Sequence, residues 1–493
     1  MKYKFNKESV NVSKSVANIE HMHIVEQDIL VSDIYPDILK ILNVNVKNNI
    51  TNIINQDNSI IIQGRLTYKV LYKAADGKEK YRVINSKSTY KIDIPVKEDL
   101  KNTNINVLDN IMNVSYNMPN ERKVYIKTDI LFNISVQKKY NVSFAKGFID
   151  KVECQKKVIK KNIKNILEEK EVTHNTREEI NLKSGLPDIY EIIEEIHTIN
   201  KPEYKVSYNK IIIKADLVGS IKYLTQKEEK HVYESTYNIP ITGFIELENI
   251  PKVSHIDTLA NVVGLEISIN PNNIKSTSLI LDIETEFKAI LSEEKEVEYI
   301  EDLYFLDKEI TEKLEMESIN CNGNQFSRYI QVDMDINNAL KEGEELITIS
   351  NENININNKG NSLDGTIDFN IVVNKSKEMD CRKVTGAFKI DNENGKIASW
   401  KIKNITYTYN QNNIIMKIEM LLNTKIDGSI DVISKEEIEV KEIEENKYKS
   451  IMICTKKDNE DMWDIAKKYK TTIENIEKAN EKTSSSNKLL IMR

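Results

Sequence analysis

The sequence predicts a mainly β protein: tandem β-sandwich-like domains followed by a small α/β module of strand, helix, helix and strand. Three observations predict this fold class. Short alternating runs of Ile, Val, Tyr and Thr are separated by Asn, Asp and Gly, as in half-buried strands joined by turns. One block of the sequence recurs further along the chain. From Ser450 to Arg493 the hydrophobic period changes from two to 3.6.

Length and composition limit the possible classes of protein. A chain of 493 residues exceeds one hydrophobic core, so about three or four domains are expected. The net charge of −7 argues against nucleic acid as the main partner. The four cysteines form no CxxC pair, which favours a reducing compartment. The N-terminus lacks the apolar core of a signal peptide, and no run is apolar enough for a transmembrane segment. We therefore expect a cytoplasmic protein.

The repeat has two anchors in each of two copies. Pro36–Ile38 precedes Gly64–Tyr72 by the same distance that separates Pro187–Ile189 from Ala215–Tyr223. The second anchor pairs Ser88–Ile92 with Ser235–Ile239, shifted by four residues, and we attribute this shift to a shorter hairpin in the second copy.

A third copy is fainter. Gly365–Ile371 and Gly386–Ile390 match the two anchors, but the Pro-Asp-Ile element is missing. Each copy ends in a long alternating strand, over residues 124–136, 279–289 and 414–424. One face of each strand is apolar, and in the first two copies the opposite face is rich in charged and polar residues, as in antiparallel sheets with one buried face. Three sandwich-like domains follow from this pattern.

These patterns divide the chain into seven parts. They are an N-terminal segment (1–27), a first β domain (28–150), a charged linker helix (151–175), a second β domain (176–300), a third, divergent β domain (301–433), an acidic linker (434–447) and a terminal module (448–493). We expect the linker helix because Ile159, Ile163, Ile166 and Leu167 have helical spacing among lysines. The glutamates after Ser434 predict a solvated tether.

The terminal module has its own small core. Apolar residues at i, i+3, i+4 and i+7 predict the first helix, and Thr471 with Glu474 fits a capping box for the second. The expected core residues are Met462, Ile465, Ala466, Tyr469, Ile473, Ile476, Leu489 and Ile491.

The module resembles the LysM family in the run Met462–Tyr469, in Thr471–Ile473, in Asn480 and in Leu489–Ile491. Asn459–Asp461 stand where most members have Gly-Asp-Thr, the Gly before the closing strand is missing, and Met492 replaces a Pro. In that family these loops approach N-acetylglucosamine polymers. The departures therefore favour a protein ligand over a sugar.

We expect the protein-binding surface on the first helix of the module. An aromatic side chain rimmed by charges is the usual composition of a binding hot spot. The candidate residues are Trp463, Asp464, Lys467, Lys468, Lys470 and Thr471. Trp463 is equally compatible with a place in the module's core.

Taken together, the Pro-Asp-Ile element, the Gly-x-Leu-x-Tyr-x-Val-x-Tyr signature of Gly64–Tyr72 and the terminal LysM-like module resemble the SPOCS-domain spore coat assembly proteins, of the SipL type. The resemblance covers about residue 28 to 493. It implies a non-enzymatic scaffold in the mother cell, peripheral at the forespore, that supports coat encasement. It also implies that the LysM module binds a morphogenetic ATPase at the forespore surface. The alternative is a wall-associated protein that binds peptidoglycan through N-acetylglucosamine.

The sequence predicts no catalytic residue, metal site or cofactor. His21 and His23 form a pair without a third ligand nearby, and the other histidines are isolated from any Cys or Ser nucleophile. The glycines are dispersed, so no phosphate-binding loop is formed. The run Lys156–Lys164 could contact an anionic membrane, but the glutamates that follow favour a solvated surface.

Overall fold

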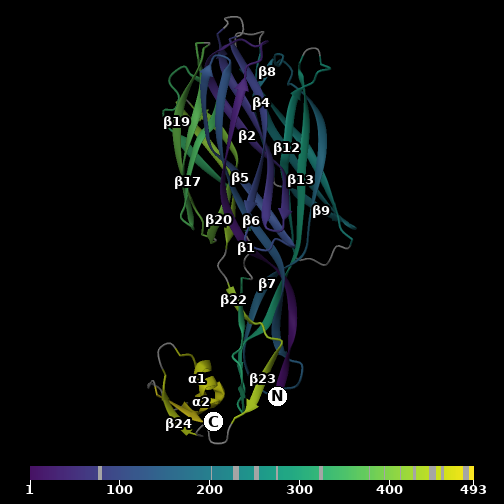
Figure 1. Ribbon diagram of the computed structural model, residues 1–493, viewed down its shortest axis with the longest axis vertical. Helices are drawn as coiled ribbons and strands as arrows, with labels where there is room; N and C mark the ends of the chain where they lie inside the picture. The colour runs from purple at the N-terminus through teal and green to yellow at the C-terminus, as the bar shows by residue number, and fades with distance from the viewer. Residues whose placement is uncertain are drawn as a thin grey trace.

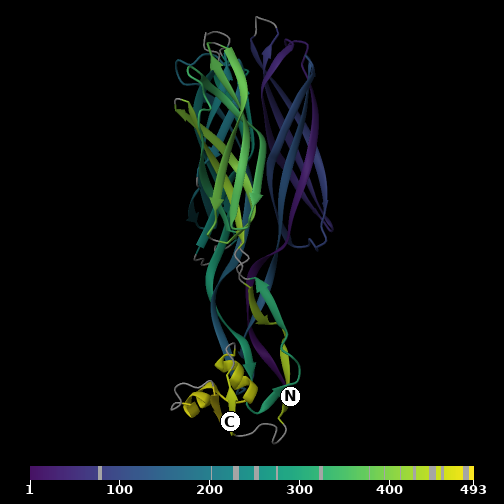
Figure 2. The ribbon, with the colours of Figure 1, turned by 90° about the vertical axis from the view of Figure 1, so that its left-hand side faces the viewer.

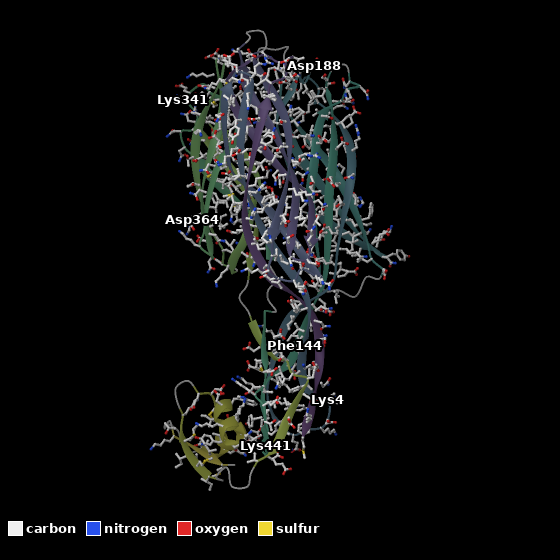
Figure 3. The ribbon with its side chains drawn as sticks, viewed as in Figure 1. Lys4, Phe144, Asp188, Lys341, Asp364 and Lys441 are labelled. Atoms are coloured by element: carbon white, nitrogen blue, oxygen red, sulfur yellow. The ribbon has the colours of Figure 1, made fainter. Side chains whose placement is uncertain are left out.

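The computed structural model describes residues 1–75, 80–200, 202–225, 232–248, 255–273, 276–320, 326–376, 378–393, 395–410, 412–425, 429–443, 451–456, 460–480 and 488–492. The molecule is elongated, with three β-rich heads at one end, a stalk of strands below them and the small terminal module at the foot (Figure 1). Both ends of the chain lie at the foot of the stalk. Figure 3 places Lys4 and Lys441 there, Phe144 along the stalk and Asp188 at the far end of the heads.

Head 1 consists of two layers of antiparallel strands, β1–β6–β5 and β2–β3–β4, that enclose one core. The first layer is part of an eight-stranded sheet that continues from β5 into head 3. Its strands are β1 (Lys2–Leu30), β2 (Ile38–Gln56), β3 (Ser59–Ala74), β4 (Tyr81–Pro95), β5 (Thr103–Asn120) and β6 (Lys123–Phe148). The predicted alternating face of β6 is buried from Val124 to Val136. Alternation of apolar and polar residues therefore places one face of each sheet inside.

Heads 2 and 3 repeat this arrangement. Head 2 contains β7 (Gln155–Asn181), β8 (Glu191–Ile199), β9 (Glu203–Ser207), β10 (Lys210–Leu224), β11 (Val232–Glu246), β12 (His255–Ile269) and β13 (Ser278–Tyr304). Head 3 contains β16 (Phe326–Ile336), β17 (Glu345–Asn358), β18 (Ser362–Lys375), β19 (Glu378–Asp391), β20 (Lys396–Asn410) and β21 (Asn413–Lys425). The layers of head 2 are β12–β13–β7 and β11–β10–β8, with β9 also paired to β10. The layers of head 3 are β16–β21–β20 and β17–β18–β19, and β17 pairs with β5 of head 1 at Asn353 and Asn113. The predicted mainly β fold class is confirmed.

Two features of the repeat have a structural role. Tyr72 and Tyr223 each donate a hydrogen bond to the carbonyl of the Pro in the Pro-Asp-Ile element of the same head, at 3.1 and 3.0 Å. In every head a glycine lies directly opposite an aromatic residue on the neighbouring strand, and the ring covers the glycine. The pairs are Gly64 with Tyr90, Gly219 with Tyr237 and Gly365 with Phe388.

The expected shorter hairpin in the second copy is wrong. The pairs Lys73–Tyr81 and Leu224–Val232 enclose the same number of residues. The glycine and its aromatic partner instead lie closer along the strand to Tyr223 in head 2 than the equivalent pair lies to Tyr72 in head 1. Because the displacement is an even number of residues, the aromatic ring stays on the same face of the sheet.

The three heads meet at equivalent positions. Each head has a β-bulge near the start of its second sheet, and the bulged residues Leu42, Ile193 and Ile347 are all buried in one shared cluster. A bulge frees a backbone carbonyl from the strand ladder. The carbonyls of Leu42 and Ile347 accept hydrogen bonds from Asn370 and Lys222 of a neighbouring head, at 2.7 and 2.8 Å. The bulges therefore allow hydrogen bonds between the heads.

The stalk consists of strand pairs that descend from the heads (Figure 2). The lower halves of β1 and β6 pair with each other, as do those of β7 and β13, and β15 (Met316–Asn320) pairs with β22 (Ser429–Ile433). Their apolar faces meet in a second core that includes Val12, Phe144, Ile163 and Tyr299. Near the foot, β23 (Glu437–Glu442) pairs with β1 and with β14 (Lys308–Ile310).

Three of the predicted parts differ from the structure. The N-terminal segment 1–27 lies in strand β1, which runs through the stalk into head 1. The linker helix 151–175 is wrong, because strand β7 begins at Gln155 and runs through the rest of this segment. The acidic linker 434–447 is partly wrong, since Glu437–Glu442 form strand β23, while residues 444–447 lie outside the described residues. Ile159 and Ile163 are four residues apart, and an even spacing also fits one face of a strand.

The lysine-rich strand β7 lies opposite the acidic half of β13. Lys157 pairs with Glu301 at 2.9 Å, and Lys160 pairs with Glu298 at 3.1 Å. Opposite charges across an antiparallel pair favour this register. Lys157 and Lys160 of the lysine run therefore have their counter-charges within the stalk.

Candidate functional site

The terminal module contains β24 (Ile451–Thr455), α1 (Met462–Tyr469), α2 (Ile473–Asn480) and β25 (Lys488–Met492), and the two strands pair antiparallel. Asp461 caps α1, because its side chain accepts a hydrogen bond from the Asp464 amide at 2.7 Å. The second helix is capped by Thr472, not by the predicted Thr471. Thr471 instead donates its hydroxyl to the carbonyl of Met492, which ties the helices to β25.

The eight residues expected in the core of the module lie in one cluster. Ile465, Ala466, Ile476 and Ile491 are buried, and Met462, Tyr469, Ile473 and Leu489 pack against them. Asn480 joins α2 to β25, since its amide donates to the carbonyls of Ile476 and Leu490 at 2.7 Å and accepts from the Leu490 amide at 2.8 Å. Hydrophobic spacing therefore fixes the fold of the module, and one polar side chain fixes the closing strand.

The first helix of the module faces the stalk. Trp463 is only 8% exposed, and its indole Nε1 donates to Asp302 Oδ2 at 2.8 Å. Lys467 Nζ lies 2.6 and 2.7 Å from the two carboxylate oxygens of the same Asp302. Glu301, the residue before Asp302, is a β-bulge in β13. A bulge re-aims the side chains next to it, and here Asp302 contacts α1.

Tyr304 is the second anchor of this contact. Its ring meets that of Trp463 edge to face with centroids 5.0 Å apart, and its hydroxyl donates to the carbonyl of Thr471 at 2.7 Å. Burial, together with the nearby charge of Asp302, raises the pKa of Tyr304 to about 12. Lys470 Nζ adds a hydrogen bond to the carbonyl of Lys308 at 3.2 Å. We call Asp302, Tyr304 and Lys308 the stalk clasp.

The six candidate binding residues thus divide into two groups. Trp463, Lys467, Lys470 and Thr471 contact the stalk clasp, whereas Asp464 and Lys468 are exposed. Sequence reasoning missed Asp302 and Tyr304. Asp302 stands within a long acidic run, and no local pattern separates it from the glutamates around it.

The free face of the module is apolar. On the outer side of the β24–β25 pair, Ile451, Ile453 and Met492 are 64%, 73% and 43% exposed, and Leu490 lies beside them. The cross-strand pairs Ile451–Met492 and Ile453–Leu490 place all four side chains on one face. We call these four residues the outer apolar face. Contiguous exposed apolar side chains of this kind mark interaction sites in soluble proteins.

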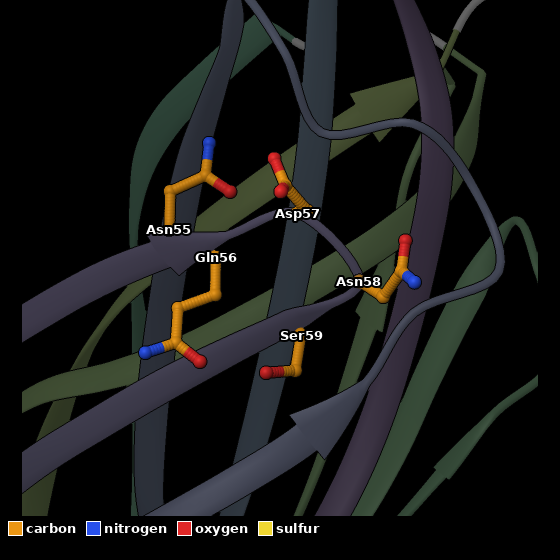
Figure 4. A pocket seen from close by; sticks show the side chains of 5 residues that line it. All are labelled: Asn55, Gln56, Asp57, Asn58 and Ser59. Carbon is orange, nitrogen blue, oxygen red and sulfur yellow. The ribbon is translucent and has the colours of Figure 1, made fainter.

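A shallow hollow over the β2–β3 turn is lined by the consecutive polar residues Asn55–Ser59 (Figure 4). Within the described part of the chain, no group of three His, Cys, Asp or Glu side chains could hold a metal ion. Over the same residues, no helix is long and apolar enough to cross a membrane.

Comparison with known protein families matches residues 457–491 to the LysM domain. No curated protein and no solved structure matches the chain. The match covers both helices and most of β25, so the module that carries Trp463, the helix caps and the bridging Asn480 is a LysM domain.

Proposed function

We propose that this protein is a non-enzymatic scaffold whose LysM domain is its binding end, and that the ligand is a wall polymer containing N-acetylglucosamine, such as peptidoglycan. The observation that carries the proposal is the LysM match over residues 457–491 at the foot of the stalk. The heads support the role of scaffold, because their buried polar groups bind one head to another.

Sedimentation with purified peptidoglycan tests this function. The full chain should pellet with the polymer, and a chain that ends at residue 443 should stay in the supernatant. The control is the Asp380→Ala variant, which removes an exposed ion pair of the heads and leaves the module unchanged. Equal recovery of the full and shortened chains in the supernatant would count against glycan binding.

The outer apolar face supports a second candidate function. N-acetylglucosamine polymers are polar, so four exposed apolar side chains fit a protein better than a glycan. In this reading the protein is a spore coat scaffold of the mother cell, peripheral at the forespore, that supports encasement. Its LysM domain binds the morphogenetic ATPase of the coat, in line with the resemblance of the tandem β domains to SPOCS proteins.

A charge placed in the outer apolar face distinguishes the two candidates. Ile453→Asp should abolish recovery of the protein partner from sporulating cells and leave peptidoglycan sedimentation intact. The matched control is Lys478→Asp, which introduces the same side chain on the exposed surface of α2. A shell of fluorescently tagged protein around the forespore would support the coat function, and a uniform distribution in sporulating cells would contradict it.

A further inference from the structure

We propose that the stalk is a built-in docking surface for helix α1 of the LysM domain, and that it competes with any external ligand of that helix. The surface is the stalk clasp, Asp302, Tyr304 and Lys308. Its occupant is the Trp463–Thr471 side of the chain's own module. The part of this inference that concerns ligands rests on the proposed function, whereas the docking itself does not.

The contact is specific in its geometry. One carboxylate, that of Asp302, accepts hydrogen bonds from Trp463 Nε1 and from Lys467, and it also accepts from the Leu303 amide at 2.9 Å. Hydrogen bonds between charged groups are stronger than neutral ones. Tyr304 adds an edge-to-face ring contact with Trp463 and a hydrogen bond to the Thr471 carbonyl.

The covalent connection favours the docked state. The amide of Ile443 donates to the carbonyl of Asp307 at 3.2 Å, so the connection to the module begins beside the clasp. An extended chain spans about 3.5 Å per residue, and residues 444–450 therefore keep β24 within about 30 Å of Ile443. Short linkers give effective concentrations of the order of millimolar, so a small contact suffices to hold the module.

In the docked state, part of the surface of α1 is inaccessible to ligands. Trp463 is 8% exposed, and Lys467 is occupied by Asp302. A ligand that needs these side chains must displace the stalk, and its apparent affinity is the intrinsic affinity multiplied by the fraction of molecules that are open. A ligand of the outer apolar face meets no such barrier, because that face lies on the other side of the module's sheet.

Fluorine NMR tests the docking directly. The chain has two tryptophans, so protein labelled with 5-fluorotryptophan gives two signals, and Trp463→Phe assigns them. In the unaltered protein, a soluble gadolinium chelate should leave the Trp463 signal sharp. Asp302→Ala and Lys467→Ala should shift the ratio of docked to open molecules by about tenfold or more towards the open state and broaden that signal.

The control separates docking from the stability of the helix. Lys468 is the neighbour of Lys467 on α1, but it is exposed and lies over the ring of Tyr469. Lys468→Ala should therefore leave the Trp463 signal as sharp as in the unaltered protein. Equal broadening in the two lysine variants, or a Trp463 signal that is broadened in the unaltered protein, would overturn the docking.

Binding of a defined probe tests the competition. Asp302→Ala changes only the stalk, so it should raise the affinity of the full chain for an N-acetylglucosamine hexamer by the same factor by which it opens the module. An unchanged affinity, with a broadened Trp463 signal, would overturn the competition. If neither protein binds the hexamer, the proposed glycan function fails, and the NMR result still decides whether the stalk holds the module.

Discussion

The contact between the heads and the contact between the stalk and the LysM domain join parts of one chain, but they are built differently. The heads share a buried cluster in which all three contribute apolar side chains, and polar groups such as Arg82 and Glu191 are buried within the contact. The contact with the module buries the ring of Tyr304 and involves Leu306, but its polar contacts depend on the partly exposed carboxylate of Asp302, the Tyr304 hydroxyl and a backbone carbonyl. We infer that the heads are permanently assembled, whereas the contact between the stalk and the LysM domain is reversible.

Arg82 shows how firmly heads 1 and 2 are joined. Its guanidinium lies 2.7 Å from Glu191 Oε1 and is stacked between the rings of Tyr35 and Tyr190, 4.2 and 5.0 Å from their centroids. Arg is suited to such sites because its planar group stacks and forms paired hydrogen bonds. The charge is therefore fully compensated within the contact.

The largest effect is expected from breaking this pair. Glu191→Ala should lower the free energy of unfolding by about 3–5 kcal/mol, because it leaves Arg82 buried without its partner. The midpoint of urea unfolding measures the loss. The exposed pair Lys40–Asp380 is the control, and Asp380→Ala should cost less than about 1 kcal/mol. Similar losses in the two variants would mean that the contact between the heads is no stronger than a surface ion pair.

A glycine substitution tests the packing inside one head. Gly64→Ala should destabilise the protein by about 1–3 kcal/mol, because the new methyl group would collide with the ring of Tyr90. Thermal unfolding measures this. The control Gly147→Ala should be close to neutral, since its methyl group would have only Lys156 Nζ nearby, at 3.7 Å. Unchanged stability of the Gly64 variant would show that the aromatic ring moves aside without cost.

Acid should weaken head 2. Burial, assisted by the charge of Lys47, lowers the pKa of His197 to about 4. The unfolded chain takes up this proton near pH 6.5, so the stabilising contribution is complete above pH 6.5 and is lost as the pH falls towards 4. Unfolding compared between about pH 7 and about pH 5 should show a loss on the order of 2 kcal/mol that His197→Gln abolishes. The exposed His255 serves as the control, and His255→Gln should keep the loss.

The smallest effect is expected at the clasp. Tyr304→Phe should weaken docking by about 1 kcal/mol, because the hydrogen bond to the Thr471 carbonyl is lost. The raised pKa of Tyr304 means that docking is complete below pH 10, the usual pKa of Tyr, and weakens as the pH rises towards 12. The Trp463 fluorine signal should therefore broaden above pH 10 in the unaltered protein. If Tyr304→Phe shows the same pH dependence, the tyrosine is not its cause.

Periodicity predicted much of the fold because it reports a buried face. The long strands ending each copy, the two helices of the module and its core were all visible as apolar residues at a period of two or 3.6. The spacing of Ile159 and Ile163 predicts a helix for β7, but four residues fit one face of a strand equally well. The partner strand β13, which decides between the two, is distant in sequence. Without that partner strand, the lysines of β7 are typical of the solvated face of a helix.

The sequence by itself determined the β domains, their repetition and the LysM domain, since each depends on neighbours within a short stretch of chain. Only the tertiary structure decided that bulges at Leu42, Ile193 and Ile347 bring the heads together, and that Asp302 holds Trp463. These contacts join residues more than a hundred positions apart, between surfaces whose local patterns are ordinary. Which carboxylate meets which indole depends on where the folded strands place them, and a local pattern carries no such information.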